Sequence, residues 1–267
     1  MRSTGPPAKT ESWTLSRVDN EPDHSWSAWR LSVKAMVLAA GLGTRLRPLT
    51  EDKPKCLIPL AGRPLLDWTL RWLYRWGVTE CVINLHYLAA QVKQFLGDGS
   101  RYGIQVHYSY EPQLLGTAGA VKKVAGFFDR PFFVIYSDNF SQWNLGRLVD
   151  VHEKQNPVAT VAVHWRDDVT QSGMIEMDGD NRILRFIEKP QARAATSHYV
   201  NAGFYYLDPG VLSYIPENAF CDFAFDVFPT MLDAGKKILA VKMEDPIIGI
   251  DTLESYRQAN HLAAKLL

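Results

Sequence analysis

The sequence predicts an α/β protein built around a mainly parallel central sheet. From Lys34 onward, short apolar runs alternate with helix-like segments, which is the pattern of successive βαβ units. Hydrophobic residues make up 46% of the 267 residues and charged residues 22%, as in folded globular proteins. This length is enough for one large α/β domain, or two small ones, with a well-buried core.

The predicted elements of the first half follow in order. The first strand, Ala35–Ala40, is a continuous apolar run, as expected of a parallel strand that is buried on both faces. Similar strands are predicted at Glu80–Leu85, Ile104–Tyr110 and Pro131–Ser137. Helices are predicted between and after them at Leu65–Trp76, Leu88–Leu96, Ala118–Ala125 and Leu145–Gln155, before a strand at Val158–His164.

The pattern changes in the second half of the chain. Strands are predicted at Met174–Met177, Ile183–Ile187 and Tyr199–Leu207, without long helices between them. This predicts a smaller antiparallel or mixed portion, because parallel strands need long crossover connections. The segment Phe223–Leu232, a strand at Ile238–Met243 and a helix at Leu253–Leu267 complete the chain.

The N-terminal segment differs in character from the rest. Residues 1–33 are polar and contain Pro6, Pro7 and Pro22, so we expect a poorly ordered arm before a domain at residues 34–267. A second hypothesis takes Val33 or Met36 as the true start, with the arm as an upstream extension. The arm lacks the apolar core of a signal peptide, and no run reaches the roughly 18 apolar residues of a membrane span.

The net charge narrows the class of binding partner, and the cysteines indicate the compartment. Lys+Arg and Asp+Glu both number 29, so the formal net charge is zero. Partners such as nucleic acids and anionic membranes usually require a basic excess, whereas small anionic molecules need only a local cationic pocket. Cys56, Cys81 and Cys221 show no metal-ligand spacing and are interpreted as buried apolar residues in a reducing cytoplasm.

Three tryptophans recur along the helix predicted at Leu65–Trp76. Trp68, Trp72 and Trp76 stand four residues apart, which places them on one helix face. This face either packs on the sheet or forms a partner surface, for example in a homo-oligomer. The sequence leaves both hypotheses open.

A glycine-containing loop follows the first strand. Gly41 and Gly43 allow backbone N–H groups to approach an anion closely at the carboxyl end of a parallel strand, where α/β folds bind ligands. Arg45 adds a guanidinium that matches phosphate oxygens, and Pro54 stiffens the chain before Lys55. The dinucleotide motif G-x-G-x-x-G and the Walker A motif do not fit, but the string G-x-G-T-R-x-x-P-x-T, followed by P-K-x-x-x-P, is specific.

Residues 34–70 closely resemble the signature of the sugar-1-phosphate nucleotidyltransferases, in their compact bacterial form. Further motifs occur in the order that this family shows, namely L-L-G-T-A-G-A at 114–120, S-D-N at 137–139, E-K-P at 188–190 and N-A-G at 201–203. The resemblance implies a Rossmann-like three-layer sandwich of the GT-A type, with a smaller mixed portion that binds the sugar. It also implies Mg²⁺-dependent transfer of a nucleotidyl group from an NTP to a sugar-1-phosphate.

The resemblance assigns roles to individual residues. It implies catalytic roles for Arg45, Lys55 and Asp138. The residues expected to bind the nucleotide are Leu38, Ala40, Gly41, Gly43, Thr44, Arg45, Glu111, Gly116, Thr117, Ala118 and Gly119. Those expected to bind the sugar phosphate are Lys55, Gly173, Glu188, Lys189 and Asn201, while Asp222 and Asp226 are expected to be caps or structural partners.

The second metal ligand depends on the alignment of G-I-D-T-L-E at 249–254 with the family's D-x-G-T-P-E. One alignment places Gly249 at the ligand position and removes the ligand, whereas the preferred one makes Asp251 the partner of Asp138. The residue types suit the reaction, because a sugar phosphate with a second pKa of about 6 is already ionised and needs no general base. Catalysis then depends on positioning and on cations.

Two other functions stay open at this point. A GT-A glycosyltransferase would share the fold, although it has no triphosphate for the glycine loop to bind. A non-catalytic nucleotide-binding or regulatory protein would follow if Gly249 replaced the ligand. Neither the nucleotide (GTP, CTP or UTP) nor the sugar is determined. The expected partners are small molecules in the cytoplasm, with no nucleic acid and no membrane.

Overall fold

The computed structural model describes residues 33–267, so the predicted arm lies outside the described residues apart from Val33. Val33 already pairs with Val78 at the start of β1. The first strand therefore begins one residue before residue 34, where the sequence predicts that the domain begins. Within the described residues, one large sheet has the order β10-β9-β11-β6-β1-β4-β5, with β8 beside β11 and β12 beside β8.

The predicted strands and helices are all present, with ends that coincide with the prediction or differ by up to a few residues. The strands of the large sheet are β1 (Val33–Leu38), β4 (Val78–Leu85), β5 (Gln105–Tyr110), β6 (Phe132–Tyr136), β8 (Ala159–Trp165), β9 (Gly173–Met177), β10 (Ile183–Glu188), β11 (Tyr199–Leu207) and β12 (Ile238–Met243). The helices are α1 (Leu65–Arg75), α2 (Ala89–Leu96), α3 (Gly116–Lys123), α4 (Gly146–Gln155), α5 (Phe228–Asp233) and α6 (Leu253–Ala264). Two small antiparallel pairs, β2 (Pro59–Leu60) with β3 (Arg63–Pro64) and β7 (Asn139–Phe140) with β13 (Ile248–Gly249), complete the fold.

The sheet has a parallel part and a mixed part, as the sequence predicts. Strands β5, β4, β1 and β6 run parallel to one another. Strand β11 runs antiparallel to β6, β8 and β9, and β10 runs antiparallel to β9. The carboxyl ends of β1 and β6 therefore meet at one edge of the sheet, where a ligand site is expected in such folds.

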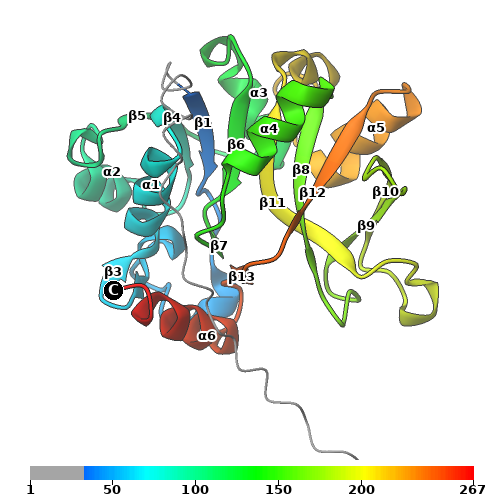
Figure 1. Cartoon of the computed structure of the whole chain (residues 1–267). Coiled ribbons are helices and arrows are strands. Elements are labelled where there is room, and N and C mark those ends of the chain that lie inside the picture. Colours follow the sequence, from blue (N-terminus) through cyan, green and yellow to red (C-terminus); the bar gives the residue numbers. More distant parts are fainter. Residues whose placement is uncertain (1–32) are drawn as a thin grey trace, which may run out of the picture.

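Helices cover both faces of the sheet and give three layers (Figure 1). Buried side chains of α1, α2 and α4 form one hydrophobic core with the first face. Side chains of α3, α5 and the π-helical turn before α5 form a second core with the other face. In β1, Met36 faces one core and Val37 the other, which explains the continuous apolar run of this strand. The three-layer α/β prediction is confirmed.

The tryptophan face of α1 belongs to the interior. Trp68, Trp72 and Trp76 are 7%, 2% and 6% exposed, and the indole N–H of Trp72 donates to the carbonyl of Trp143 at 2.8 Å. The hypothesis of a partner surface on this face is therefore wrong, because the side chains are already covered by the sheet and its neighbours.

The cysteines agree with the sequence prediction. Cys56, Cys81 and Cys221 are buried free thiols, and burial raises the pKa of Cys56 and Cys81 to about 12. They pack as small apolar residues. Among the described residues, every helix is too short or too polar to cross a lipid bilayer.

Candidate active site

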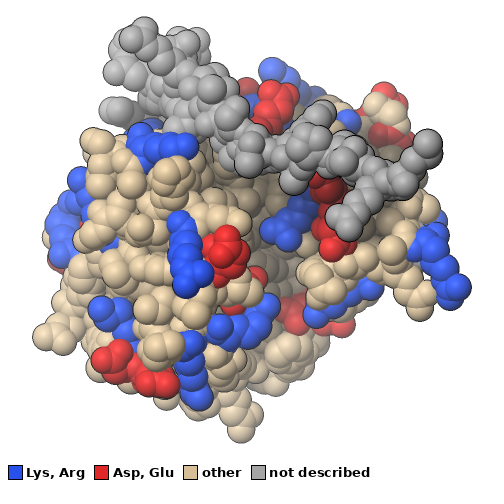
Figure 2. All heavy atoms as spheres, turned by 90° about the horizontal axis from the view of Figure 1, so that it is seen from below, with Lys and Arg blue, Asp and Glu red and all other residues tan. Residues whose placement is uncertain are grey.

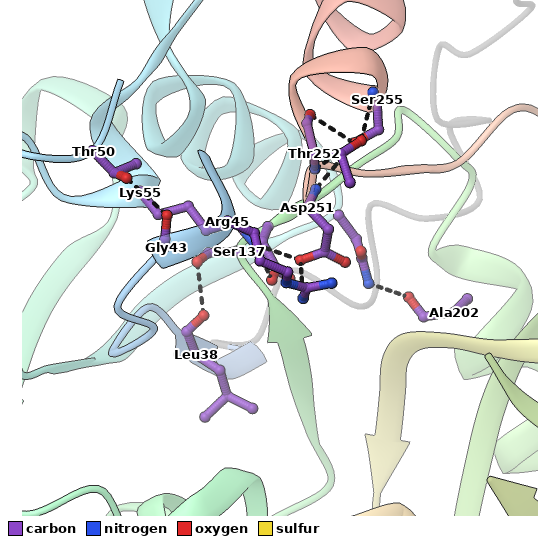
Figure 3. Close-up of polar contacts among 12 residues, drawn as sticks. Leu38, Gly43, Arg45, Thr50, Lys55, Ser137, Ala202, Asp251, Thr252 and Ser255 are labelled. Atoms are coloured by element: carbon purple, nitrogen blue, oxygen red, sulfur yellow. Dashed lines mark hydrogen bonds and ion pairs between the residues drawn. The ribbon is translucent and has the colours of Figure 1, made fainter. Parts of the chain in front are cut away.

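The candidate site begins where β1 and β6 end side by side. Leu38 pairs with Tyr136 at the last position of the two strands, and the Leu38 carbonyl accepts hydrogen bonds from the backbone N–H and the hydroxyl of Ser137 at 3.1 and 2.7 Å (Figure 3). The glycine loop that follows Leu38 and the carboxylate of Asp138 are thereby brought together. Parallel pairing of two apolar strands is the physical cause.

Gly43 shapes the glycine loop. Its φ of 64° lies in the left-handed region, and a Cβ there would stand 3.1 Å from both Lys55 Cβ and Thr50 Cγ2. The Thr50 hydroxyl donates to the Gly43 carbonyl at 2.7 Å and closes the loop (Figure 3). Gly41, Thr44 and Arg45 lie exposed on this loop, where solvent and a ligand can reach them.

Lys55 lies at the centre of a cluster of charges. Its ammonium is 2.7 Å from Asp138 Oδ2 and 3.0 Å from Asp251 Oδ1, while its side chain is 11% exposed. Burial lowers the pKa of Lys55, but the charges and hydrogen bonds of the two carboxylates outweigh this effect and raise it. Lys55 is therefore a fixed positive charge in this site.

Asp251 reaches the same cluster from the C-terminal part of the chain. The N–H of Ile250 donates to the Asp138 carbonyl at 2.8 Å, which holds the segment after β13 beside the end of β6. Arg45 Nη2 is 2.9 Å from Asp251 Oδ1 (Figure 3). Burial raises the pKa of Asp251, but Lys55 and Arg45 outweigh it and hold the pKa below its usual value.

The geometry bears on the two alignments of residues 249–254. Gly249 pairs with Asn139 in the small β13–β7 sheet, whereas the Asp251 carboxylate points at Lys55. Thr252 caps α6 through a reciprocal pair of hydrogen bonds with Ser255. Asp251, and not Gly249, therefore lies opposite Asp138, with Lys55 between the two carboxylates.

Glu111 lies inside the protein. It is 1% exposed, and its two carboxylate oxygens accept from Asn84 Nδ2 at 2.8 Å and from the N–H of Leu115 at 3.1 Å. Asn84 in turn accepts from the N–H of Ala39 at 2.7 Å. In this structure Glu111 links the loop after β1 to the loop before α3, instead of presenting a free carboxylate to a base.

The first amides of α3 are engaged by the protein. Thr117 donates its N–H and its hydroxyl to Asp222 Oδ1 at 2.9 and 2.8 Å. The N–H groups of Ala118 and Gly119 donate to the carbonyl of Cys221 at 2.9 and 3.0 Å. Asp222 is thus a cap, as the sequence predicts, and these three amides are already satisfied.

The residues expected to bind the sugar come together on β9, β10 and β11. Gly173 pairs with Glu188, and a Cβ at Gly173 would lie 2.9 Å from Glu188 Oε2 and 3.9 Å from Asn201 Cβ. Burial raises the pKa of Glu188. Lys189 follows, exposed at the surface.

The sugar side joins the charged cluster through Asn139. Asn139 Nδ2 donates to the carbonyl of Ala202 at 2.8 Å (Figure 3). Asn139 follows Asp138 in the chain, and Ala202 follows Asn201, so this bond holds the two segments together. Figure 2 views the molecule from below and shows Lys, Arg, Asp and Glu side chains beside one another around a hollow in this face. Neutral overall charge therefore conceals a strongly polar site.

The family model described as nucleotidyl transferase matches residues 34–265 of this chain. The chain belongs to the nucleotidyl transferase family. It is 34% identical over 241 residues to a UTP–glucose-1-phosphate uridylyltransferase of Synechocystis, an alignment that covers 85% of this chain and 62% of that protein. It is 36% identical over 189 residues to a probable mannose-1-phosphate guanylyltransferase of Oryza sativa, covering 68% of this chain and 52% of that protein. The chain thus spans between half and two thirds of the length of these relatives.

A solved structure supports the same family. A protein from Bacillus anthracis, assigned as a glucose-1-phosphate thymidylyltransferase and solved in complex with sucrose, superimposes with a TM-score of 0.79 at 25% identity. The match covers 87% of this nucleotidyl transferase and 96% of that chain. The GT-A-like fold implied by the sequence motifs is confirmed.

The donor set of this nucleotidyl transferase suits a divalent cation. Oxygens of Asp138 and Asp251 converge on one ammonium, which is the arrangement that two carboxylates adopt around a shared cation. Within residues 33–267, no three His, Cys, Asp or Glu side chains gather closely enough to hold a metal together. Mg²⁺ typically takes one or two carboxylates and completes its shell with water and phosphate oxygens, so the two carboxylates fit it.

Several contributors to the site are absent from the sequence prediction. Asn84 orders the loop after β1, Ser137 ties β6 to β1, and the charge of Arg166 helps to lower the pKa of Asp251. A polar residue within the apolar run at 80–85 is the signal for Asn84. Ser137 stands in the S-D-N motif, but its bond to Leu38 follows only from the pairing of β6 with β1. Arg166 carries no sequence signal.

Proposed function

We propose that this nucleotidyl transferase joins a nucleotidyl group from an NTP to a sugar-1-phosphate, giving an NDP-sugar and pyrophosphate. The observation that carries the proposal is the position of Lys55 between Asp138 and Asp251, beside the glycine loop and at the carboxyl ends of β1 and β6. The positive charges of Lys55 and Arg45, with a cation that the two carboxylates could hold, suit two phosphorylated substrates that repel each other. Membership of the family and the activities of its relatives point in the same direction.

The chemistry requires positioning more than proton transfer. A sugar phosphate, with a second pKa of about 6, is already a nucleophile at neutral pH. One of its oxygens attacks the α-phosphorus of the NTP, and the bond from that phosphorus to the bridging oxygen of pyrophosphate breaks. Lys55 supplies positive charge to the phosphates that meet, and Arg45 supplies it to the departing pyrophosphate.

Mg²⁺ belongs to the proposal. Asp138 and Asp251 would hold it, and when bound it would act as a Lewis acid that binds the phosphate oxygens and offsets their charge. Lys55 would then give up its carboxylate partners in favour of a phosphate oxygen. The exposed Arg45 and the half-exposed carboxylates, 37% and 42%, leave room for this exchange.

The substrates to try first follow from the relatives. We propose UTP with glucose-1-phosphate and GTP with mannose-1-phosphate as the leading pairs, with CTP as a third nucleotide. We also propose that the reaction runs in the cytoplasm, because reduced, buried cysteines suit that compartment. Nucleic acids and membranes are not proposed as partners. Any homo-oligomer would form away from the buried tryptophan face of α1.

The test is release of pyrophosphate from a panel of NTPs and sugar-1-phosphates with Mg²⁺. We expect turnover with at least one pair and its loss in Lys55→Ala and in Asp138→Ala. Turnover that survives both substitutions would contradict the proposed site. Binding of an NTP without turnover would favour a regulatory protein, and sugar transfer from an NDP-sugar would favour a glycosyltransferase.

A further inference from the structure

A line of hydrogen-bonded side chains connects the sugar side of the site to the start of α3. Asn201 Nδ2 donates to the Tyr205 hydroxyl at 2.7 Å, and Tyr205 donates to the Tyr136 hydroxyl at 3.2 Å. The side chain of Thr117 interacts with Tyr136 and lowers the pKa of that hydroxyl, and its own hydroxyl donates to Asp222 Oδ1 at 2.8 Å. Three side chains thus lie in series between the sugar residue Asn201 and the carboxylate of Asp222.

The hydrogen bonds from Asn201 through Tyr205 to Tyr136 point in one direction. Tyr136 accepts from Tyr205, which accepts from the Asn201 amide. At the other end of the line, Thr117 gives its hydroxyl hydrogen to Asp222, and its oxygen accepts from the backbone N–H of Phe223 at 3.0 Å. Chains of this kind strengthen as each bond polarises the next, most of all where they end on a charged group.

The two tyrosines are suited to a fixed role. Tyr205 is fully buried, and its ring meets the edge of the Tyr136 ring at a centroid distance of 5.6 Å. Burial raises the pKa of Tyr205 to about 12 and that of Tyr136 well above its usual value. Both hydroxyls therefore keep their protons at neutral pH and remain donors.

The amide of Asn201 has its orientation determined from two sides. Its Oδ1 accepts from the N–H of Gly203 at 2.9 Å, and its Nδ2 is held by Tyr205. The pairing of β11 with β8 shifts register between Asn201 and Tyr205, which turns this segment toward the site. Gly203 has a φ of 71°, and a Cβ there would stand 2.8 Å from Tyr136 Cγ, so a glycine lets the tyrosine lie beneath the turn.

We propose that Tyr136 and Tyr205 are positioning residues that orient the Asn201 amide for the sugar and connect it to Thr117 on the nucleotide side. The inference deepens the proposed function and rests on it. Neither tyrosine has to touch a substrate in this role. Each acts through a neighbour, Tyr205 through Asn201 and Tyr136 through both Tyr205 and Thr117.

The kinetic test compares Tyr205→Phe with Tyr206→Phe. Tyr206 is the next residue of β11, and its side chain packs in the core on the opposite face of the sheet. Tyr205→Phe removes both hydrogen bonds of this hydroxyl, of which the one from Asn201 orients the amide. Loss of that bond predicts a KM for the sugar-1-phosphate raised about 2- to 10-fold, with kcat and the KM for the NTP nearly unchanged. Tyr206→Phe should leave all three constants near those of the unsubstituted protein.

A double substitution separates positioning from general structural support. If Tyr205 acts through Asn201, the double variant of Asn201→Ala and Tyr205→Phe should have the same KM for the sugar-1-phosphate as Asn201→Ala by itself. Additive losses in the double variant would overturn the proposal. Equal effects of Tyr205→Phe and Tyr206→Phe would also overturn it.

A spectroscopic test does not depend on turnover. In a ¹H–¹⁵N spectrum of the full chain, the Asn201 side-chain amide is assigned by its loss in Asn201→Ala. We expect its signal to move in Tyr205→Phe and to respond to UTP or GTP with Mg²⁺, and we expect the nucleotide response to vanish in Tyr136→Phe. A response that persists in Tyr136→Phe, or an unmoved signal in Tyr205→Phe, would refute the connection. Should no NTP bind or react, the proposed function fails, whereas the Tyr205→Phe spectrum still tests the contact.

Discussion

Lys55 and Asp251 are separated by 196 residues in the sequence, yet Nζ of the lysine lies 3.0 Å from Oδ1 of the aspartate. The lysine arrives on the turn after the glycine loop, and the aspartate arrives just before the cap of α6. Asp138 adds a second carboxylate at 2.7 Å from the end of β6. Three distant segments thus supply one compact group of opposite charges.

Removal of the central cation should abolish most of the activity. We expect Lys55→Ala to lower kcat at least about 100-fold, because a charge aimed at the reacting phosphates is lost from a largely buried position. Lys53→Ala is the matched control, since Lys53 is exposed two residues earlier. Pyrophosphate release measures both variants. Equal activity of the two would show that Lys55 takes no part in the reaction.

The two carboxylates should determine the metal requirement. Asp251→Asn should shift the Mg²⁺ concentration for half-maximal activity upward by about 10-fold or more, because a charged oxygen ligand becomes neutral. Asp245→Asn, which changes an exposed acid six residues earlier, should leave the Mg²⁺ curve unchanged. An unshifted curve for Asp251→Asn would favour the alignment that places Gly249 at the ligand position.

The charge cluster should make stability depend on pH at both extremes. The pKa of Asp251 is lowered in the folded chain, so its contribution is present above its ordinary value of 3.8 and is lost as pH falls through the lower folded value. The pKa of Lys55 is raised, so its contribution is present below 10.5 and is lost as pH rises through the higher folded value. Urea unfolding measures the free energy of unfolding of the unsubstituted protein and of Asp251→Asn. The difference between the two should be constant near neutrality and should narrow below about pH 3.8. A difference in the free energy of unfolding that grows in acid would contradict the ion pair.

Gly43 and Gly41 offer a matched pair for the loop. Gly43→Ala should cost about 1 kcal/mol or more and lower activity, because φ is 64° and the new Cβ would press on Lys55 and Thr50. Gly41→Ala should leave the free energy of unfolding nearly unchanged, since no heavy atom lies within 4 Å of the Cβ position. Urea unfolding compares the two. A greater loss of stability in Gly41→Ala would show that the loop conformation is wrong.

Glu111 should matter for stability. Glu111→Gln replaces one acceptor oxygen by a donor that must face either Asn84 Nδ2 or the N–H of Leu115. A buried mismatch of this kind typically costs about 1 to 3 kcal/mol in the free energy of unfolding. Glu244→Gln, an exposed substitution, is the control. A Glu111→Gln protein as stable as the control would mean that Glu111 does not link the two loops.

Local sequence determined the elements of this protein and the place of its chemistry. Apolar runs such as Ala35–Ala40 predict buried strands whatever lies beside them, because the side chains need cover on both faces. Gly43, Lys55 and Asp138 stand directly after such strands or in the following loop, so a site at the carboxyl ends could be predicted from order and spacing. Motif order also pointed to the family.

The tertiary structure decided which partners those residues meet. The sequence left Gly249 and Asp251 open, and the packing of β13 on β7 turned Asp251 toward Lys55. It left the tryptophan face of α1 open, and packing placed Trp72 and Trp76 in the core at the sheet and Trp68 in a smaller core with β7 and α6. Glu111 and Tyr205 carried no signal for their roles, because a hydrogen bond depends on distance and angle between groups that are remote in sequence.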